Sequence, residues 1–441
     1  MQTKNFALSL ENLTQEDDNI YDFWNNNVFR SCLVQVFCGE LNPLNLEHIA
    51  QHLKSVLPEQ SVLIGTTTSG EIYQGKMLEN SVVVSVTLFE KSTLKSAHVC
   101  EHGEVSEIGE KLANAVCTEE TKAVIIFSDG LQINGEIITK SFSEHAIGEP
   151  ILAGGLAGDN NRFEETWIIH DETVFNNGSL AVSLNGEELN AFNTYSLSWT
   201  SLGSNMEVTK SENGRVYEID HRPIIEVYRQ FLGDDAVANL PDSAIEFPLI
   251  IQDQEIPVAR TIVQVFEDNS FLFAGNLPEG SIVKFGMPNT IAFDENCLQM
   301  RDNLIAQNTQ SCFIYSCVAR KAFLGKTLEN EFKPIAKIAP VAGFFTYGEI
   351  YHFNHDINCQ DGNDSLLNVT TTILGLSESN TLNHQPTTLD FTQNSIESSV
   401  KSLSNSVLIN LVNETTNSLN KQLVKQTTRR KLQTHSAFQS I

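Results

Sequence analysis

The stretch Ile151-Leu-Ala-Gly-Gly-Leu-Ala-Gly-Asp159 is the part of the chain from which its fold can best be predicted. A short apolar run leads into three glycines and ends at an acid, which predicts a strand that delivers bare backbone into a tight bend. Glycines at such a bend permit a left-handed backbone or let a second backbone or a ligand approach closely. Two interpretations stay open: a packed turn, or amide groups that meet a polar ligand.

A second turn of the same kind lies far upstream. The stretch Gly65-Thr-Thr-Thr-Ser-Gly-Glu71 also ends an apolar run and also places a carboxylate after a glycine. This recurrence favours the ligand-binding interpretation over the packed turn. We therefore expect the glycine turns to converge on a common cavity with their carboxylates directed inward.

Length and composition indicate a globular protein with more than one domain. The chain has 441 residues, of which 41% are hydrophobic and 19% are charged. This length predicts two domains and leaves room for a third segment. The formal net charge of −27 predicts a chain that repels nucleic acid and anionic membrane surfaces.

The last part of the chain has the opposite charge balance. Residues 381–441 contain three acids and six bases, which leaves 52 acids and 22 bases in the remainder. We therefore treat this tail as a separate segment.

Targeting signals and cysteine usage both predict a cytoplasmic protein. The sequence has no apolar run near the roughly 18 residues that cross a bilayer, and its first twenty residues lack a signal-peptide core. Three of the eight cysteines, Cys32, Cys38 and Cys312, fall within apolar strand patterns, which is typical of reduced core thiols. The chain has no Cys-x-x-Cys pair, so a structural zinc site of the usual spacing is not expected.

Hydrophobic periodicity predicts an α/β (α+β mixed) fold. Residues 31–38 and 61–68 have strand patterns, and the apolar stripe between them, ended by Pro58, predicts a helix over 44–57. The polar turn at 176–178 predicts antiparallel strands farther on, so a purely parallel sheet is not expected. We predict two domains with mixed β-sheets flanked by helices, plus a C-terminal amphipathic helix.

The pattern changes after residue 190 and then repeats its style. A helix is predicted from Pro223 to Leu232 with Gly233 as its C-cap, and the domain boundary is placed at about 200–220. The predicted segments are a polar lead-in at 1–30, domains at 31–200 and 201–378, and a linker with an amphipathic helix at 379–441.

Several motifs resemble the FIST family. The stretches Gly65–Ile72, Ala153–Asp159 and Asn177–Ser183 are similar to its N-terminal domain. Its C-terminal domain is similar to the stretches Trp199–Gly203, Val208–Lys210, Val216–Asp220, Cys317–Arg320 and Gly343–Ile350. The resemblance runs from about 30 to 378 and assigns 31–200 to the FIST N-terminal domain and 201–378 to the FIST C-terminal domain.

This resemblance implies an intracellular small-ligand sensor in bacterial-type signal transduction and not an enzyme. One branch of the family implies a haem-based nitric oxide sensor that regulates a separately encoded histidine kinase or cyclic-di-GMP enzyme. The chain departs from the family at Leu366-Leu-Asn-Val-Thr370, where many members have Phe-His-Asn-x-Thr. Any role of that histidine is therefore absent here. The alternatives are a haem-free receptor for amino acids or other small polar solutes, and an enzyme on a small polar substrate.

Two carboxylates stand in a shared Gly-Glu-Ile context, Glu71 and Glu349. Facing one cleft, they would bind an amine or cationic ligand or perform acid–base work. The alternative is that each accepts hydrogen bonds from nearby groups and locks its own turn. Arg320 is expected to pair with one of these acids, with another structural partner or with a ligand carboxylate.

The predicted ligand lies between the two halves and shifts their arrangement. The predicted ligand-binding residues are Gly65, Ser69, Glu71, Gly154, Gly155, Asp159, Arg320, Tyr347 and Glu349. Catalytic signatures are poor, because the chain has no P-loop, no Gly-x-Ser-x-Gly and no His-Glu-x-x-His. Thr68 and Ser69 beside Glu71 are a weak nucleophile candidate without a neighbouring histidine.

Haem b, if bound, needs an axial donor such as His, Cys or Tyr. The stretch after Ile350 contains His352, His355 and Cys359, which would also suit a transition metal, and His170 follows the glycine turn. We single out His352 and His170 as candidate haem ligands. Without a Cys-x-x-Cys-His sequence, any haem would be noncovalent.

The tail carries an apolar stripe at helical spacing. Its residues are Ile396, Val400, Leu403, Val407, Leu411, Leu419 and Leu423. Because the surrounding Ser, Asn and Thr are weak helix formers, this helix is expected to need a partner. We expect a homodimer through the C-terminal helix or docking on a separate partner, with a helix folded back on its own body as the alternative.

Overall fold

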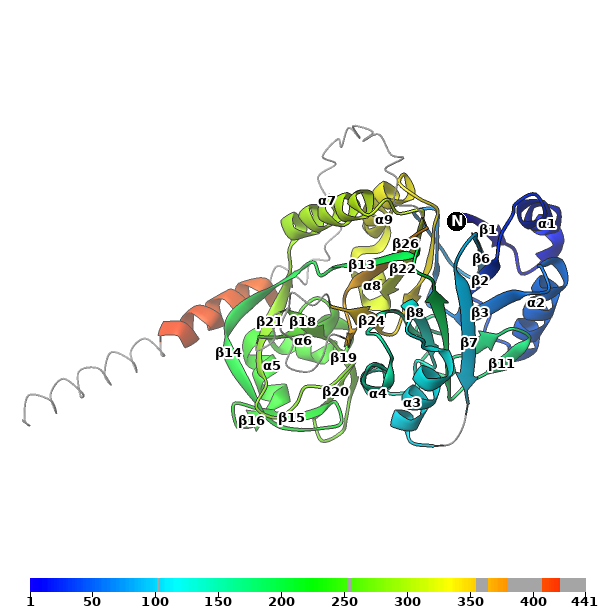
Figure 1. Ribbon diagram of the computed structural model, residues 1–441. Coiled ribbons are helices and arrows are strands. Elements are labelled where there is room, and N and C mark those ends of the chain that lie inside the picture. The colour runs from blue at the N-terminus through cyan, green and yellow to red at the C-terminus, as the bar shows by residue number, and fades with distance from the viewer. Residues whose placement is uncertain (101–102, 253–255, 354–363, 379–406, 421–441) are drawn as a thin grey trace, which may run out of the picture. The chain divides into compact units, whose positions relative to one another are not determined.

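The computed structural model describes residues 1–100, 103–252, 256–353, 364–378 and 407–420, and they form two compact units (Figure 1). Of the described residues, unit 1 contains 1–198 and 290–378, and unit 2 contains 199–289 and 407–420. The mixed α/β class is confirmed. Within the described ranges, no helix combines the length and the apolar character that a membrane span requires.

Unit 1 has, in its described part, three six-stranded sheets that share one internal order. Across each sheet, the order is an edge strand, a strand antiparallel to both of its neighbours, two strands parallel to each other, and a short hairpin. The first sheet runs β1 (Gln2–Leu8), β6 (Val82–Phe89), β2 (Ser31–Cys38), β3 (Ser61–Thr67), β10 (Ile168–His170), β11 (Thr173–Phe175). The second runs β7 (Thr93–Val99), β12 (Ser179–Asn185), β8 (Thr121–Ser128), β9 (Ile151–Leu156), β24 (Glu349–His352), β25 (Asp364–Leu367). The third runs β13 (Asn190–Ser196), β26 (Thr371–Ser377), β22 (Ser311–Cys317), β23 (Val341–Thr346), β4 (Glu71–Tyr73), β5 (Lys76–Leu78).

The sheets exchange strands cyclically, so unit 1 has pseudo-threefold internal symmetry. Each parallel pair is a strand, helix, strand segment whose following hairpin joins a different sheet. We define repeat 1 as β2 to β7, repeat 2 as β8 to β13 and repeat 3 as β22 to β26. The edge strands β7 and β13 of repeats 1 and 2 also join the neighbouring sheet. The equivalent strand for repeat 3 is β1, from the start of the chain.

Helices connect the strands and cover the sheets of unit 1 (Figure 1). Asn42 illustrates why they begin where they do: its side chain accepts the Leu44 N–H, and Pro43 occupies the first helical position. The apolar stripe that predicted this helix is buried at Leu46, Ile49 and Leu53. The helices of unit 1 are α1 (Asp17–Asn25), α2 (Pro43–Val56), α3 (Val105–Val116), α4 (Gly135–His145), α7 (Thr290–Ala306), α8 (Val318–Leu324) and α9 (Glu329–Ala336), with short 3-10 turns η1 (Leu13–Glu16) and η3 (Gly325–Leu328).

The inner faces of the three sheets share one hydrophobic core. Phe37, Phe127 and Tyr315 occupy matching positions on the three repeats, each one residue beyond the position that pairs with a strand glycine. The Phe344 ring lies 5.3, 5.6 and 5.7 Å from the three rings, centroid to centroid. Phe344 therefore fills the centre of the core, where the matching residues of the other repeats, Thr66 and Gly155, are small.

Unit 2 is built on antiparallel strands. Its described strands are β14 (Trp199–Glu212), β15 (Arg215–Ile219), β16 (Arg222–Pro223), β17 (Leu249–Ile251), β18 (Val258–Arg260), β19 (Ile262–Val265), β20 (Phe271–Phe273) and β21 (Ile282–Pro288). Its helices are α5 (Ile224–Leu232), α6 (Asp234–Ala238), the 3-10 turn η2 (Asp242–Ile245) and a helix over 407–420. As predicted, Gly233 ends α5 with a left-handed φ of 90°.

The compact units do not follow the predicted segments. The chain leaves unit 1 after residue 198, close to the predicted boundary, but residues 290–378 return to it. The physical reason is strand pairing, because β26 pairs with β13, β23 with β4 and β24 with β9. Residues predicted to lie in a second domain thus complete sheets that the first 198 residues begin.

The tail helix lies against its own unit in the described part. Val407 and Leu411 of the predicted stripe are buried within unit 2, whereas Leu419 is 49% exposed. This is the alternative in which the helix folds back on its own body. Ile396, Val400, Leu403 and Leu423 lie outside the described residues.

The described cysteines are free thiols. Cys32, Cys38 and Cys312 are buried core residues, as predicted. Burial raises the pKa of each of the three thiols, which keeps them protonated and unreactive.

Candidate functional site

The glycine turns of the three repeats meet at the carboxyl ends of the parallel strands. We call residues 68–71, 157–160 and 346–349 the apex turns, and each begins three residues after the glycine at the same register position of its strand, Gly65, Gly154 or Gly343. A ring of three backbone hydrogen bonds joins them: Ser69 N–H to the Phe345 carbonyl (3.0 Å), Gly158 N–H to the Thr67 carbonyl (3.0 Å) and Tyr347 N–H to the Leu156 carbonyl (3.2 Å). The two glycine turns with which the sequence analysis began belong to repeats 1 and 2, and they meet here together with the turn of repeat 3.

The first apex turn is closed by its own carboxylate. Glu71 is fully buried and accepts hydrogen bonds from the Thr68 hydroxyl and from both the hydroxyl and the N–H of Ser81. The Thr68 hydroxyl in turn accepts the Gly70 N–H at 3.2 Å. Desolvation raises the pKa of the Glu71 carboxyl. Glu71 therefore locks the turn to the start of β6.

The third apex turn repeats this arrangement. Glu349 is fully buried and accepts hydrogen bonds from the hydroxyls of Thr346 and Thr370, and the Thr346 hydroxyl accepts the Gly348 N–H at 3.2 Å. Burial raises the pKa of the Glu349 carboxyl to about 8. Both glutamates thus lock their own turns, which is the structural alternative of the two interpretations. Both also lie in unit 1, so the expected placement of one turn in each domain is not met.

The second apex turn departs from the other two. Ala157 and Asn160 stand where the others have the threonine and the glutamate, so the Thr–Glu lock is missing. The chain instead continues through residues 160–167 before β10 begins. Three residues of this loop adopt a left-handed backbone without being glycine: Asn160 (φ 57°), Asn161 (φ 62°) and Phe163 (φ 54°). Such backbone strain persists only where surrounding contacts hold it, and it clusters at ligand clamps and switches.

Asp159 holds this loop. Its carboxylate accepts the N–H groups of Phe163 at 3.0 Å, Glu164 at 2.7 Å and Glu165 at 3.2 Å. The Tyr347 hydroxyl from the third apex turn donates to the same carboxylate and accepts the Asn161 N–H at 3.1 Å. Burial and the neighbouring Asp159 carboxylate raise the pKa of the Tyr347 hydroxyl, so it remains a donor.

An aromatic pair covers the turn on the outside. The Phe163 ring lies 4.8 Å from the Tyr347 ring at an interplanar angle of 12°, and Phe163 is 52% exposed. A buried carboxylate, a phenol and an exposed aromatic face therefore lie together at one accessible turn. We call Asp159, Phe163 and Tyr347 the apex triad.

The glycines serve close packing of backbone. A Cβ at Gly158 would lie 2.5 Å from the Ser69 hydroxyl and 2.8 Å from its nitrogen. At Gly154, where φ is 124°, a Cβ would lie 2.0 Å from the Ile126 carbonyl oxygen. The other predicted glycines lie within strands, Gly65 of β3 paired with Val36 of β2 and Gly155 of β9 paired with Glu349 of β24. The packed-turn interpretation therefore describes these glycines.

Arg320 is held away from both apex glutamates by a structural ion pair. It is fully buried and donates two hydrogen bonds to Glu331, at 2.9 and 2.8 Å. Glu331 also accepts the Thr371 hydroxyl. Of the predicted ligand-binding residues, Ser69, Asp159 and Tyr347 thus meet at the apex, whereas the guanidinium of Arg320 binds inside the protein.

The two histidines proposed as haem ligands already bind protein groups. His170 has its Nδ1 2.6 Å from His98 Nδ1 and its Nε2 2.9 Å from the Ser96 hydroxyl. His352 is 4% exposed and its Nδ1 lies 2.8 Å from Asp364. His170 therefore does not fit as a haem ligand while this pairing lasts, and burial of His352 on β24 leaves little room for a porphyrin. His355 and Cys359 lie outside the described residues, and the residues that are described contain no group of three or more metal-ligating side chains.

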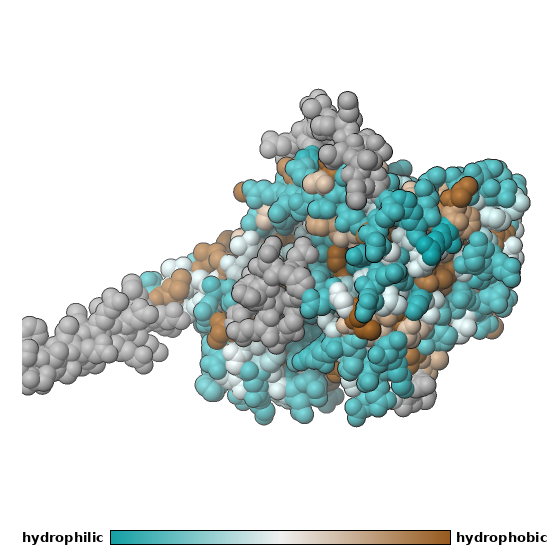
Figure 2. Space-filling view, in the orientation of Figure 1, coloured by the Kyte–Doolittle hydropathy of each residue, from teal (hydrophilic) through white to brown (hydrophobic). Residues whose placement is uncertain are grey.

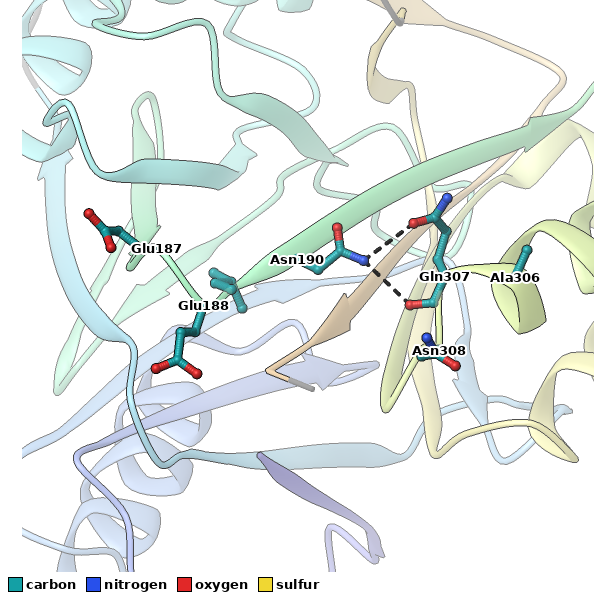
Figure 3. Close-up of a pocket in the computed structure, with 7 residues that line it drawn as sticks. Glu187, Glu188, Asn190, Ala306, Gln307 and Asn308 are labelled. Carbon is teal, nitrogen blue, oxygen red and sulfur yellow. Dashed lines mark hydrogen bonds between the residues drawn. The ribbon is translucent and has the colours of Figure 1, made fainter. Parts of the chain in front are cut away.

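Two hollows of the described surface lie elsewhere. One, of about 370 Å³, is lined by Glu187, Glu188, Leu189, Asn190, Ala306, Gln307 and Asn308 (Figure 3). In it the Asn190 amide donates to the backbone and side-chain oxygens of Gln307, at 3.4 and 3.3 Å. The other, of about 450 Å³, lies in unit 2 between Lys210, Ser211, Glu212, Tyr217 and Glu279. Neither hollow is lined by a predicted ligand-binding residue. The first lies beyond the end of β12, which is the end of the sheet away from the apex turns.

Sequence reasoning missed the hydroxyl partners and the threefold pattern. Thr68 and Thr346 precede their glutamates by the same spacing, so a repeated Thr-x-Gly-Glu-Ile was available as a signal. Ser81 and Thr370 follow from no local pattern, because the chain brings them to the carboxylates only through the strand pairing of β6 and β26.

Comparison with family models gives two matches that together cover most of the chain. The FIST N domain model matches residues 32–222, and the FIST C domain model matches residues 225–352. Comparison with curated proteins gave no match. The first model thus extends into unit 2, and the second runs from unit 2 back into unit 1.

Proposed function

Since this chain belongs to the FIST family, whose domains generally sense small ligands in signal transduction, we propose that it is a small-ligand sensor with the apex triad as its ligand-responsive element. Membership of the family supports the sensor function. We choose the triad as the ligand-responsive element because the second apex turn differs from the other two.

The comparison among the three turns supports this location. Glu71 and Glu349 are fully buried and bound by hydroxyls of their own repeats, so they offer a ligand no access. Asp159 is also buried, but its partners are a strained loop and a tyrosine covered by the half-exposed Phe163. A small displacement of this loop uncovers a carboxylate and a phenol together. Strained, accessible segments of this kind are drawn from the low-stability end of a structure, as ligand-responsive loops are.

The chemistry of the triad favours a small ligand with an amino group. The Asp159 carboxylate collects N–H donors, and an ammonium group satisfies the same acceptor with a charge-assisted bond. The faces of Phe163 and Tyr347 attract cations beside it. Amino acids and similar polar amines are therefore the ligand class of this proposal.

A thermal-shift screen with single amino acids and simple amines tests the function. A ligand that binds the folded state raises the melting temperature by mass action, by several degrees at about a hundred times Kd. The variant Tyr347→Phe, which keeps the ring but removes the hydroxyl, is expected to weaken that shift. Glu349→Gln is the matched control, because this buried glutamate lies outside the triad, and it should leave the shift unchanged.

A third variant separates the triad from the polar hollow. Gln307→Ala removes an amide that lines the hollow of Figure 3. A ligand shift that survives Tyr347→Phe but disappears in Gln307→Ala would move the ligand site to the hollow and contradict the choice of the triad. A screen in which amines and amino acids give no shift would contradict the ligand class.

Haem is not part of this proposal, because both ring nitrogens of His170 are engaged and His352 is buried. The purified protein is therefore expected to be colourless and to gain no Soret band when haemin is added. Regulation of a histidine kinase or a cyclic-di-GMP enzyme stays a prediction from family resemblance, and so does the absence of catalysis.

A further inference from the structure

The helix over 407–420 has two faces with different surroundings, and it is the orange helix of Figure 1. On the inner face Val407, Leu411 and Thr415 are buried against unit 2. The Asn410 amide fixes this orientation by donating to the carbonyls of Gln230 and Phe231 in α5, both at 3.1 Å. The helix is therefore attached to its own unit along one side only.

The outer face carries large apolar side chains that the described unit leaves uncovered. Ile409 is 62% exposed, Val412 45% and Leu419 49%. Figure 2 shows brown, apolar surface on the part of this helix that faces the viewer. With Thr416 between them, these residues follow the spacing three, four, three. That is the a/d pattern of a coiled-coil seam, which is narrower than the stripe of an ordinary surface helix.

The pattern continues beyond the described residues in the sequence alone. Leu423 stands at the next position of the same heptad, four residues after Leu419. We call Ile409, Val412, Thr416 and Leu419 the outer seam. Successive helical residues turn by 100°, so the centres of the inner stripe and the outer seam lie roughly 120° apart around the helix axis. One helix can therefore bind its own unit and a second helix at once.

Charge favours a second copy of this chain as the partner. The chain outside 381–441 carries 52 acids and 22 bases, so most of the surface of one copy repels another. The tail has six bases and three acids, and the only charge among residues 407–420 is Glu414, which accepts the amide groups of Gln230 and Asn417. The outer seam is thus an uncharged strip in the one basic segment of an acidic chain. The same strip on a second copy can pack against it, because a twofold interface joins identical surfaces.

We propose that the outer seam is a homodimer interface, in which Ile409, Val412 and Leu419 of two copies pack in register as a short parallel coiled coil. The outer seam spans 11 residues, about one and a half heptads, and so short a seam gives a weak association. The dimer is therefore expected to dissociate on dilution. This inference is independent of the ligand proposed for the apex triad.

Sedimentation equilibrium of the full chain at about 1 to 100 µM tests the interface. The wild-type mass is expected to rise toward twice that of the single chain. Val412→Lys places a charge in the seam and should keep the chain monomeric, with an unchanged melting temperature. Asn417→Lys adds the same charge to an exposed position outside the seam, and it should dimerise like the wild type.

Cross-linking gives a second readout that does not rely on a disruptive variant. In a chain with Cys100→Ser and Cys359→Ser, Val412→Cys is expected to form a disulfide-linked dimer under mild oxidation, whereas Asn417→Cys is not. A wild-type chain that stays monomeric over the whole range overturns the proposal. A Val412→Lys chain that still dimerises also overturns it, because the contact must then lie elsewhere.

Discussion

At the scale of single residues, the apex shows how one carboxylate can either lock a turn or hold a loop. Glu71 and Glu349 have the same partners at the same positions, a threonine three residues before and a hydroxyl at the start of the antiparallel strand. Asp159 stands one position before the site of the glutamates, and it accepts backbone N–H groups and a tyrosine hydroxyl instead. The difference follows from a few substitutions in repeat 2, chiefly Ala157 and Asn160.

Replacing Glu349 by Gln is expected to remove a pH dependence of stability. Because the folded-state pKa of this carboxyl is raised to about 8, the folded protein binds a proton that the unfolded chain releases near its ordinary pKa. Its contribution is therefore fully present below about pH 4.5 and is lost as the pH rises to about 8. Urea unfolding at pH 5 and pH 8 should show a smaller difference in free energy for Glu349→Gln than for the wild type. An unchanged difference would show that Glu349 is ionised throughout.

Glu71→Gln tests the first apex turn. Both carboxylate oxygens of Glu71 accept hydrogen bonds, one from the Thr68 hydroxyl and the other from Ser81, and a glutamine keeps only one accepting oxygen. We expect this variant to lose about 1 to 3 kcal/mol of unfolding free energy. Chemical denaturation measures the loss, and a Glu71→Gln chain as stable as the wild type would show that the Ser81 and Thr68 contacts do not contribute as the structure indicates.

The histidine pair His98 and His170 is expected to make stability fall in acid. Burial lowers the pKa of His170, the His98 ring and Lys54 lower it further, and Asp171 acts in the opposite direction. A lowered folded-state pKa means that stability is present above about pH 6.5 and is lost as the pH falls through the folded value. Strand register places His98 and His170 at the positions of Tyr195 and Tyr351, whose rings also meet edge to face.

The double variant His98→Tyr with His170→Tyr replaces the histidine pair by two uncharged tyrosines, as in the equivalent pair Tyr195 and Tyr351. Melting temperatures of this variant should change less between pH 7 and pH 5.5 than those of the wild type. The two Nδ1 atoms lie 2.6 Å apart, so the His98 ring disfavours a positive charge on His170. An equal change in both proteins would place the acid sensitivity elsewhere.

At the scale of elements, the pairing of the parallel strands that lead into the apex turns requires glycine where two backbones are in contact. The local pattern predicted the strand at 151–156 and its bend, because an apolar run followed by glycines has few other outcomes. It could not show what the glycines touch. The Ile126 carbonyl reaches Gly154 only through the parallel pairing of β8 with β9, which is a property of the sheet.

Gly154→Ala is therefore expected to be among the most destabilising single substitutions in the chain, at about 4 kcal/mol or more. Its new Cβ would overlap the Ile126 carbonyl oxygen, and its φ of 124° disfavours any side chain. Gly280→Ala is the matched control, with φ of 87° and nothing within 4 Å of a new Cβ, so it should lose only about 1 kcal/mol. Chemical denaturation measures both, and equal losses would show that β8 and β9 separate easily.

At the scale of the whole molecule, the sequence predicted two domains but could not predict which segments share one. The predicted boundary lies close to the point where the chain leaves unit 1. The return of residues 290–378 depends on long-range pairings such as Asn193 with Leu374, and a single sequence contains no local signal for these. For the same reason the two Gly-Glu-Ile turns were assigned to different domains, although both belong to unit 1.

Unit 1 is expected to fold without the segment 199–289. The two ends of this segment are paired with each other, Trp199 opposite Pro288 at the start of β14 and the end of β21, so a short glycine linker can replace it. A chain of residues 1–198 and 290–378 joined in this way keeps all three sheets. It should unfold in one cooperative transition followed by circular dichroism. A chain without near-ultraviolet signal and without a transition would show that unit 1 needs the segment.

The central claim is that the apex triad responds to ligand. Hydrogen exchange of the backbone N–H groups of Phe163, Glu164 and Glu165, with and without a ligand that raises the melting temperature, tests it most directly. The account predicts that exchange changes at these three groups, which Asp159 holds, while the N–H groups of Gly70 and Gly348 exchange as before. Unchanged exchange at 163–165, with the change confined to 187–190 and 306–308, would contradict it.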